Sequence, residues 1–367
     1  MDSIPQELID AIIDNVSQTS LPSCSLVAKR WRRKSQQRVL TTISFLSEEK
    51  VKRWCTDIPR DSDGISSYVR GVSLEGIPSW TEPALLSRFL GSLSSLTTFS
   101  TYGVEIPDEL PGHISRGEFG KRITALHLCT PYSTLATLTS MILSLPDLKE
   151  LRVADCEDTP EGPLPICPVT PQRGPLESLK LRKYVGGIGE ALAKSRLTSR
   201  RLTLDVDITG IEQLLLRSSG MVVELTLYGV WFFSDRAETI VTDLPDVSAA
   251  EAIPPIHLPS LPALVTLVIY IYVDHLSPRL TNILRSIGSA PALTSIIIKY
   301  GEWRFLNHFP LADSWVDVDK WLSRIAKHAK VEGGLPLTMM RWTLQEGFLP
   351  EFRESGGRVG VDNDVRY

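Results

Sequence analysis

The chain has 367 residues, with 39 Lys and Arg against 43 Asp and Glu, and a formal net charge of −4. Its content of 43% hydrophobic and 22% charged residues is typical of a folded protein and excludes global disorder. The acidic balance gives no overall attraction to nucleic acid or anionic lipid, and no stretch approaches the roughly 20 apolar residues of a membrane-spanning helix.

The N-terminal residues and the cysteines indicate the cellular compartment in which we expect the protein. The first residues are acidic, whereas a secretory signal would begin basic and continue apolar. The 5 cysteines are scattered and contain no Cys-x-x-Cys pair. This pattern favours a reducing compartment over a disulfide framework or a structural zinc site. We therefore expect an intracellular protein, either cytoplasmic or nuclear.

Two short helices are predicted at the start of the chain. Over residues 5–16 the apolar side chains fall on one wide helix face. Residues 17–20 favour a turn, and a second apolar run follows from Leu21. Two helices this short cannot bury such faces on each other alone, so they need the rest of the chain or a partner.

The residues of these helices resemble the F-box motif, in which Leu-Pro-x-Glu-Leu is followed by Cys-x-Leu-Val-x-x-x-Trp. The matching blocks are Ile4-Pro5-Gln6-Glu7-Leu8 and Cys24-Ser25-Leu26-Val27-Ala28-Lys29-Arg30-Trp31. One departure is Ile4 in place of Leu, a substitution that conserves volume. An ordinary helical hairpin packed on its own core is the alternative.

The resemblance implies a partner and a binding surface. F-box modules dock onto the Skp-type adaptor, and through it a cullin, of SCF ubiquitin ligases. The residues that the resemblance implies for adaptor binding are Ile4, Pro5, Leu8, Ile12, Leu26, Val27 and Trp31. Nearby stand six basic residues, which we interpret as a solvated helix face rather than a localisation or phosphate-binding patch: Lys29, Arg30, Arg32, Arg33, Lys34 and Arg38.

The rest of the chain repeats one short pattern, apolar-x-x-apolar-x-apolar. Its last two positions would face the core from one strand. Successive copies are mostly 23 to 29 residues apart, the range of leucine-rich repeats, with two longer gaps of 42 and 44 residues. The copies begin at Val69, Leu96, Ile123, Leu148, Leu176, Ser199 (a weak copy), Val222, Leu264, Leu293 and Leu337.

Return segments between the strands are predicted from periodicity and from prolines. Helices are expected at residues 83–93, 133–145, 188–193, 211–217 and 277–287. Pro-rich loops are expected over 159–175 and 243–262, and a longer amphipathic helix over 315–325. Such insertions in repeat folds lie on one face, which is often the binding face.

The predicted fold class is α/β, a short helical F-box-like module followed by an irregular leucine-rich-repeat solenoid with a parallel sheet lined by helices. The repeats resemble those that follow F-boxes in fungal families, and an unrelated βαβ sheet protein is the alternative. We expect a helical module at 1–45, a connecting segment at 46–66, the solenoid at 67–350 and a flexible tail at 351–367.

The sequence contains only weak candidates for cofactor-binding or catalytic residues. Gly187-Ile188-Gly189 follows a strand and opens a helix, with Asp205 further on, but Leu192 replaces the third glycine of a dinucleotide fingerprint. His127 is expected to face outward on the sheet. Cys156 would need a basic partner to act as a nucleophile. We expect no cofactor and no metal site.

The function predicted from the sequence is a non-catalytic substrate-recognition subunit of an SCF-type ubiquitin ligase, with the repeats binding an unknown target protein. A repeat scaffold without ligase activity is the first alternative. An enzyme with a nucleotide cofactor, dependent on Gly187 and Gly189, is the second. Neither nucleic acid nor membrane is expected as a partner.

Overall fold

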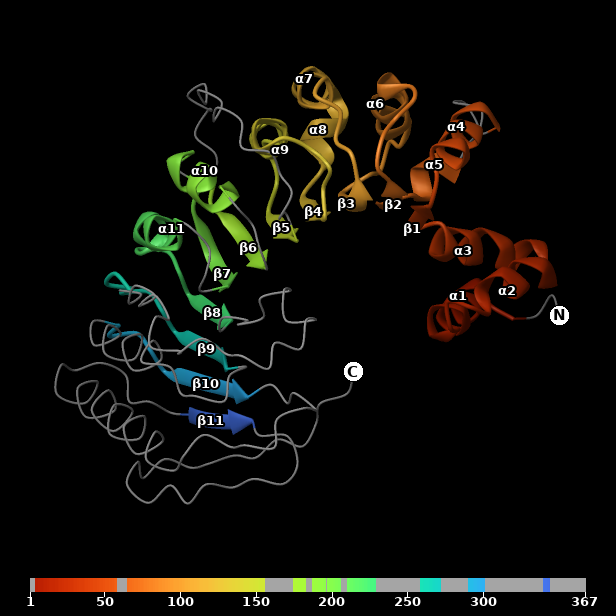
Figure 1. Ribbon diagram of the computed structural model, residues 1–367. Coiled ribbons are helices and arrows are strands. Elements are labelled where there is room, and N and C mark those ends of the chain that lie inside the picture. Colours follow the sequence, from red (N-terminus) through yellow and green to blue (C-terminus); the bar gives the residue numbers. More distant parts are fainter. Residues whose placement is uncertain are drawn as a thin grey trace, which may run out of the picture. The chain divides into compact units, whose positions relative to one another are not determined.

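The computed structural model describes residues 4–57, 65–155, 174–182, 187–195, 197–205, 210–228, 258–271, 290–300 and 339–343. The chain divides into two compact units, Met1–Arg173 and Gly174–Tyr367, and each is described by itself. Figure 1 shows the helices and strands with their labels.

Unit 1 begins with three helices, which we call the helical module: α1 (Gln6–Asn15), α2 (Leu21–Val27) and α3 (Lys29–Val39). Pro5 stands at the N-cap of α1, where its missing N–H leaves no helical hydrogen bond unmade. Ala28 adopts an extended conformation, with φ −158° and ψ 159°, and thereby separates α2 from α3. The one helix that the sequence predicts from Leu21 is therefore two helices, α2 and α3.

A parallel sheet follows, with its strands in chain order. In unit 1 these are β1 (Thr42–Phe45), β2 (Gly71–Ile77), β3 (Thr98–Val104), β4 (Ala125–Cys129) and β5 (Glu150–Ala154). Val72, Phe99, Leu126 and Leu151, the middle positions of four successive repeats, are direct partners along the ladder. The repeat pattern therefore predicted both the strands and their register.

Strand β1 was not predicted. Leu40, Ile43 and Phe45 carry the same apolar spacing, and Ile43 and Phe45 pair with Val72 and Leu74 of β2. The parallel sheet thus begins inside residues 1–45, for which the sequence predicted only helices.

Helices α4 to α9 line one side of the strands of unit 1 (Figure 1). Thr134 caps α9, because its hydroxyl accepts the N–H of Thr137 at 3.1 Å. The helices expected at 83–93 and 133–145 are confirmed as α6 and α9, and two short helices, α7 and α8, fill the return between β3 and β4. The bounds are α4 (Glu48–Asp57), α5 (Ile65–Tyr68), α6 (Pro83–Ser92), α7 (Leu110–Arg116), α8 (Glu118–Arg122) and α9 (Leu135–Leu143).

Three aromatic rings hold the start of the sheet to its helices. Phe45 of β1 meets Trp54 of α4 and Phe89 of α6 edge to face, with ring centroids 5.7 and 5.1 Å apart. Trp54 and Phe89 are 6.4 Å apart in the same geometry. Edge-to-face pairs add to the free energy already gained by burying the rings. This cluster therefore joins β1, α4 and α6 into one packing unit.

Glu48 ties the start of α4 to the turn before α6. Its carboxylate accepts the N–H of Thr81 at 2.9 Å, the Thr81 hydroxyl at 2.7 Å and the N–H of Glu82 at 3.0 Å. Burial alone would raise the pKa of Glu48, but these hydrogen bonds and the charge of Lys52 outweigh it and lower the pKa below its ordinary value of 4.5.

This geometry predicts an acid-sensitive contribution to stability. A carboxylate with a lowered pKa stabilises the fold above its unfolded pKa, and that contribution is lost as the pH falls through the folded value. Glu48→Gln should therefore lower the free energy of unfolding at pH 7. Below about pH 4.5 the variant should then lose less further stability than the wild type does. Urea unfolding of both proteins between pH 7 and pH 3 measures this. If the free energy of unfolding falls by the same amount in both proteins between pH 7 and pH 3, the prediction is wrong.

Unit 2 repeats the plan of unit 1. Leu179, Leu202, Leu225 and Leu267 are direct ladder partners, and Ile296 and Met340 continue the row. The expected helices at 188–193 and 211–217 are confirmed. The bounds are β6 (Leu176–Arg182), α10 (Ile188–Lys194), β7 (Ser199–Asp205), α11 (Ile211–Ser218), β8 (Glu224–Tyr228), β9 (Thr266–Ile271), β10 (Ser295–Tyr300) and β11 (Met339–Thr343).

The weak copy at Ser199 has a structural explanation. Ser199 is fully buried at the first position of its repeat, where other copies carry an apolar side chain. Its N–H donates to the Ser218 hydroxyl at 3.2 Å, and its own hydroxyl donates to the Arg201 carbonyl at 2.9 Å. A buried hydroxyl that is hydrogen-bonded costs little, so the repeat tolerates serine there.

The α/β class is confirmed: a helical N-terminal module is followed by a parallel sheet with helices, consistent with a solenoid-like repeat region. Several predicted segments lie outside the described residues. They are the helix at 277–287, the helix at 315–325, most of both Pro-rich loops, Cys156 and the tail. Within the described part of the chain, no helix is long and apolar enough to cross a membrane.

Candidate functional site: the helical module

The helical module has a small core of its own. Ile9 and Ile13 of α1 and Leu21 of α2 are buried, at 2%, 0% and 0% exposure. Ile9 and Ile13 lie four residues apart on α1, so one side of that helix faces α2 and α3. The partly buried side chains packed against this core are Ile4, Val16, Trp31 and Val39.

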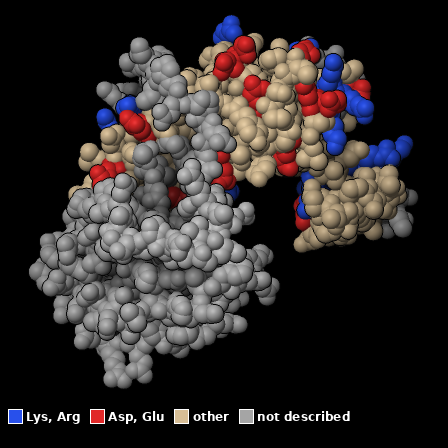
Figure 2. All heavy atoms as spheres, in the orientation of Figure 1, with Lys and Arg blue, Asp and Glu red and all other residues tan. Residues whose placement is uncertain are grey.

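Four large apolar side chains of the module point away from this core. Leu8 and Ile12 of α1 are 55% and 44% exposed, and Leu26 and Val27 at the end of α2 are 81% and 57% exposed. The face of the module visible in Figure 2 is almost free of charged side chains. Exposed apolar groups gathered on one small module are typical of a protein-binding surface.

The structure divides the seven residues of the predicted binding surface into two groups. Leu8, Ile12, Leu26 and Val27 are exposed, as is Pro5. Ile4 and Trp31 are half-buried against the core of the module instead. We call the exposed apolar four, Leu8, Ile12, Leu26 and Val27, the apolar surface.

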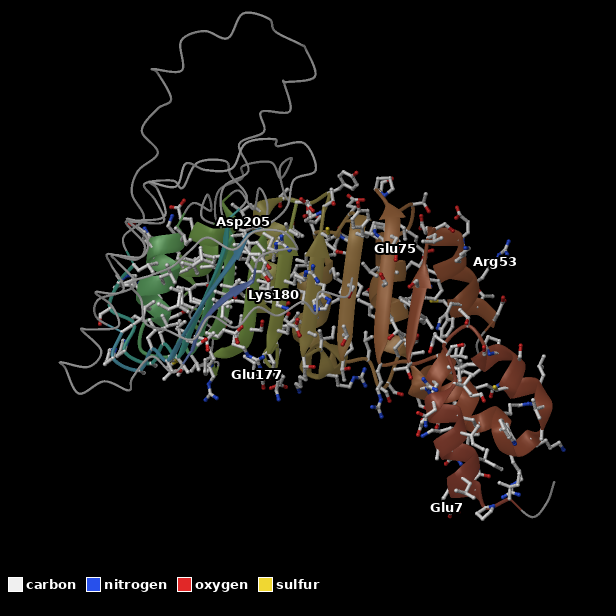
Figure 3. The ribbon with its side chains drawn as sticks, turned by 90° about the horizontal axis from the view of Figure 1, so that it is seen from below. Glu7, Arg53, Glu75, Glu177, Lys180 and Asp205 are labelled. Carbon is white, nitrogen blue, oxygen red and sulfur yellow. The ribbon has the colours of Figure 1, made fainter. Side chains whose placement is uncertain are left out.

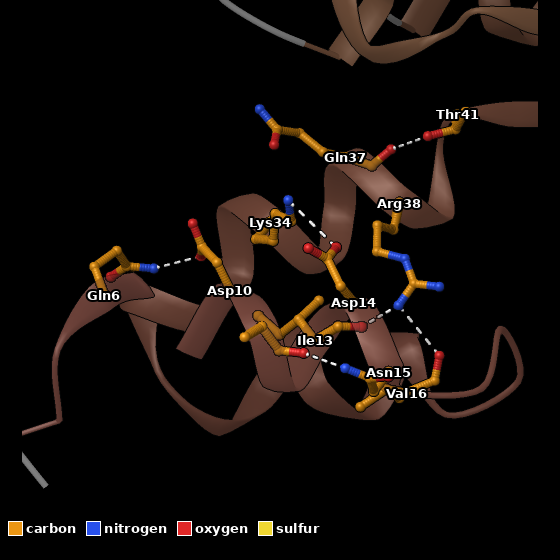
Figure 4. A network of polar contacts seen from close by, with 11 residues as sticks. Gln6, Asp10, Ile13, Asp14, Asn15, Val16, Lys34, Gln37, Arg38 and Thr41 are labelled. Carbon is orange, nitrogen blue, oxygen red and sulfur yellow. Dashed lines mark hydrogen bonds and ion pairs between the residues drawn. The ribbon is translucent and has the colours of Figure 1, made fainter. Parts of the chain in front are cut away.

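Polar contacts fix α3 against α1 (Figure 4). The guanidinium of Arg38 donates to the carbonyl of Ile13, which also accepts the N–H of Val16, and, at 3.2 Å, to the carbonyl of Val16, the C-cap residue of α1. Lys34 pairs with Asp14 at 3.3 Å. The sequence analysis missed this role of Arg38, which is part-buried rather than on a solvated face. No local sequence signal marks this role, because the contacts join residues 25 and 22 positions apart.

The start of α3 meets the start of α1. The Gln6 side-chain amide donates to the Arg30 carbonyl at 3.3 Å, and Arg30 Nε donates back to Gln6 Oε1 at 3.4 Å. Gln6 also donates to Asp10 at 2.8 Å. The first turn of α1 and the start of α3 are therefore neighbours.

The other sequence candidates have ordinary structural surroundings. His127 faces outward between buried Leu126 and Leu128, as predicted. Its Nδ1 lies 3.3 Å from the hydroxyl of Ser100, its direct strand partner, and its Nε2 lies 3.5 Å from Glu150. Register accounts for the Ser100 contact, whereas Glu150 is the strand partner of Ala125 and reaches His127 diagonally.

The glycine candidate also belongs to the repeat packing. Gly187 precedes α10, and Gly189 and Leu192 are both buried within that helix. Leu192 stands where a dinucleotide fingerprint has its third glycine, and here it is a core residue at 0% exposure. Among the described residues, no group of three or more His, Cys, Asp or Glu side chains could hold a metal ion.

Cys129 is the described cysteine whose thiol has a shifted pKa. Cys24, Cys55 and Cys129 are not in disulfides. Burial raises the pKa of the Cys129 thiol, and the charge and hydrogen bond of Asp155 add to this rise, while the hydrogen bond from Thr130 and the charge of Arg152 oppose it. A reactive cysteine needs the opposite shift, toward the thiolate.

Comparison with known proteins bears on the N-terminal part. No curated protein matches the chain. The family model described as the F-box domain matches residues 1–41. That match ends within two residues of the end of α3 and covers both sequence blocks quoted above. Residues 1–41 of this chain are an F-box domain.

Proposed function

We propose that the protein is the substrate-recognition subunit of an SCF-type ubiquitin ligase. The observation that carries this proposal is an F-box domain whose own fold leaves Leu8, Ile12, Leu26 and Val27 exposed. F-box domains in general bind a Skp-type adaptor. In this chain the adaptor would bind the apolar surface, with Pro5 beside it, and would recruit a cullin in turn.

Ile4 and Trp31 take a different role in this proposal. Both pack against the core of the module, so they would hold α1 and α3 in place rather than supply most of the contact area. The exposed four offer apolar area that burial would stabilise at about 25 cal/mol per Å² before the costs of association.

The sheet and its helices would bind the target protein. We interpret them as irregular leucine-rich repeats extending to about residue 350, because ten copies of one apolar spacing form parallel strands that pair in register within each unit. The ligase would act by proximity rather than by side-chain chemistry in this chain. Holding the target near the ubiquitin-charged enzyme raises the effective concentration of its lysines. We place this activity in the cytoplasm or the nucleus.

Co-purification with a purified Skp-type adaptor tests the proposal. The full chain should capture the adaptor stoichiometrically, and a chain that begins at Thr42 should not. The truncated chain keeps β1, which pairs with β2, so the sheet retains its first strand. If neither chain captures the adaptor, the protein is a repeat scaffold without this ligase role.

A further inference from the structure

The F-box domain carries a charge opposite to that of the chain as a whole. Residues 1–41 contain six Lys and Arg and four Asp and Glu, a net charge of +2, whereas the full chain has −4. All six basic residues lie on α3, an 11-residue helix. The charge is therefore concentrated on one element rather than spread over the domain.

The structure separates these six basic residues by role. Lys34 and Arg38 point toward α1, where they pair with Asp14 and cap the helix end (Figure 4). Arg30 is exposed and contacts only Gln6 among the described side chains.

The remaining three basic residues face solvent. Lys29, Arg32 and Arg33 are exposed and make no ion pair within the part of the chain that the structure describes. Lys29 and Arg33 are four residues apart and therefore share one face of α3. Internal packing explains Lys34 and Arg38 but leaves these three without a structural role.

The helix that carries the exposed cations begins directly after Leu26 and Val27 of the apolar surface. Leu26 and Val27 precede Lys29 by three and two residues, across the extended Ala28. The Gln6–Arg30 contacts bring the first turn of α1, which carries Leu8, to the same end of the module. Lys and Arg side chains line one margin of the uncharged face in Figure 2. An apolar centre with a cationic rim fits a partner whose apolar patch is flanked by carboxylates.

We propose that Lys29, Arg32 and Arg33 form an electrostatic docking rim for an acidic segment of the Skp-type adaptor. This inference rests on the proposed function and adds to it the chemistry of the partner: Asp and Glu beside the adaptor's apolar surface. Exposed charges at a rim steer encounter more than they strengthen the bound state. The rim therefore sets the rate of association, and the apolar surface holds the complex together.

Association kinetics of the full chain with purified adaptor test the rim. Lys29→Glu combined with Arg33→Glu should lower the association rate constant about tenfold at about 0.1 M salt, with little change in dissociation. At about 1 M salt, where the screening length falls from about 10 Å to about 3 Å, variant and wild type should converge. Lys29→Gln with Arg33→Gln should give an intermediate rate.

The matched control is Lys50→Glu with Arg53→Glu on α4. Both side chains are exposed, the change in net charge is the same, and they lie outside the F-box domain (Arg53 is labelled in Figure 3). This control should change the association rate less than about twofold. Circular dichroism of each variant verifies that α3 still forms.

The outcomes separate the two proposals. Adaptor binding that is insensitive to salt and to Lys29→Glu/Arg33→Glu overturns the rim and leaves the proposed function standing. An equal slowing by the α4 control overturns the rim as well, because net charge alone would then explain it. If the wild-type chain does not bind the adaptor at either salt concentration, both proposals fail. If Lys29→Glu/Arg33→Glu loses binding to duplex DNA or to anionic vesicles while its adaptor kinetics stay unchanged, the cations serve another partner and the docking rim is overturned.

Discussion

Replacing Leu8 and Ile12 together with Asp is expected to abolish capture of the Skp-type adaptor, with an affinity loss of more than about 100-fold. Each substitution removes an exposed apolar side chain and places a carboxylate where the partner would bury it without a counter-charge. Titration of the full chain with adaptor, followed by calorimetry or interferometry, measures the loss.

A control for this variant exists in unit 2. Leu216 and Met221 are 64% and 46% exposed, close to the values of Leu8 and Ile12, but they lie on and just after α11. Leu216→Asp with Met221→Asp should bind the adaptor as the wild type does. Both double variants should keep the wild-type melting temperature within a few degrees, because exposed positions contribute little to stability. Wild-type affinity in the Leu8/Ile12 variant would remove those residues from the binding surface.

The second large effect concerns the aromatic cluster at the start of the sheet. Phe89→Ala should lower the free energy of unfolding of unit 1 by about 3 to 5 kcal/mol, because it leaves a cavity beside Phe45 and Trp54. Phe89→Leu should cost less, on the order of 1 to 2 kcal/mol. Urea unfolding followed by hydrogen exchange in peptides from β1 and α4 localises the effect.

Leu46→Ala is the control for the cluster. Leu46 follows β1 directly but is 57% exposed, so its truncation should change stability by less than about 0.5 kcal/mol. If Phe89→Ala unfolds no more easily than Leu46→Ala, the three rings do not hold β1 and α4 to the sheet.

The repeat sheet could be predicted from sequence because its signal is redundant. Each copy repeats the spacing that puts two side chains on one face of a strand, and neighbouring copies pair in register. A single copy such as Leu40, Ile43 and Phe45 carries the same information, yet it directly follows a helix that ends at Val39 and was read as part of the module.

The exposure of the proposed binding residues could be predicted only in part. The motif implies which apolar residues would bind the adaptor, but hydrophobicity does not tell Trp31, which faces the core, from Leu26, which faces solvent. On α1 the apolar face is wide enough to contain both Ile9 and Ile12. Which of them is buried depends on where α2 and α3 pack, and this is a tertiary property. The inward role of Arg38 is hidden from sequence for the same reason.

The junction between α3 and β1 has a mechanical consequence. Only Leu40 and Thr41 separate the helix from the strand, and the Thr41 carbonyl accepts the N–H groups of Arg70 and Gly71 at 2.9 and 2.8 Å. These two hydrogen bonds join the last residue of the F-box domain to the start of β2. The orientation of an adaptor bound to the F-box domain would then be set relative to β1 and β2. Which lysine of a bound target receives ubiquitin would depend on the direction in which that target is presented.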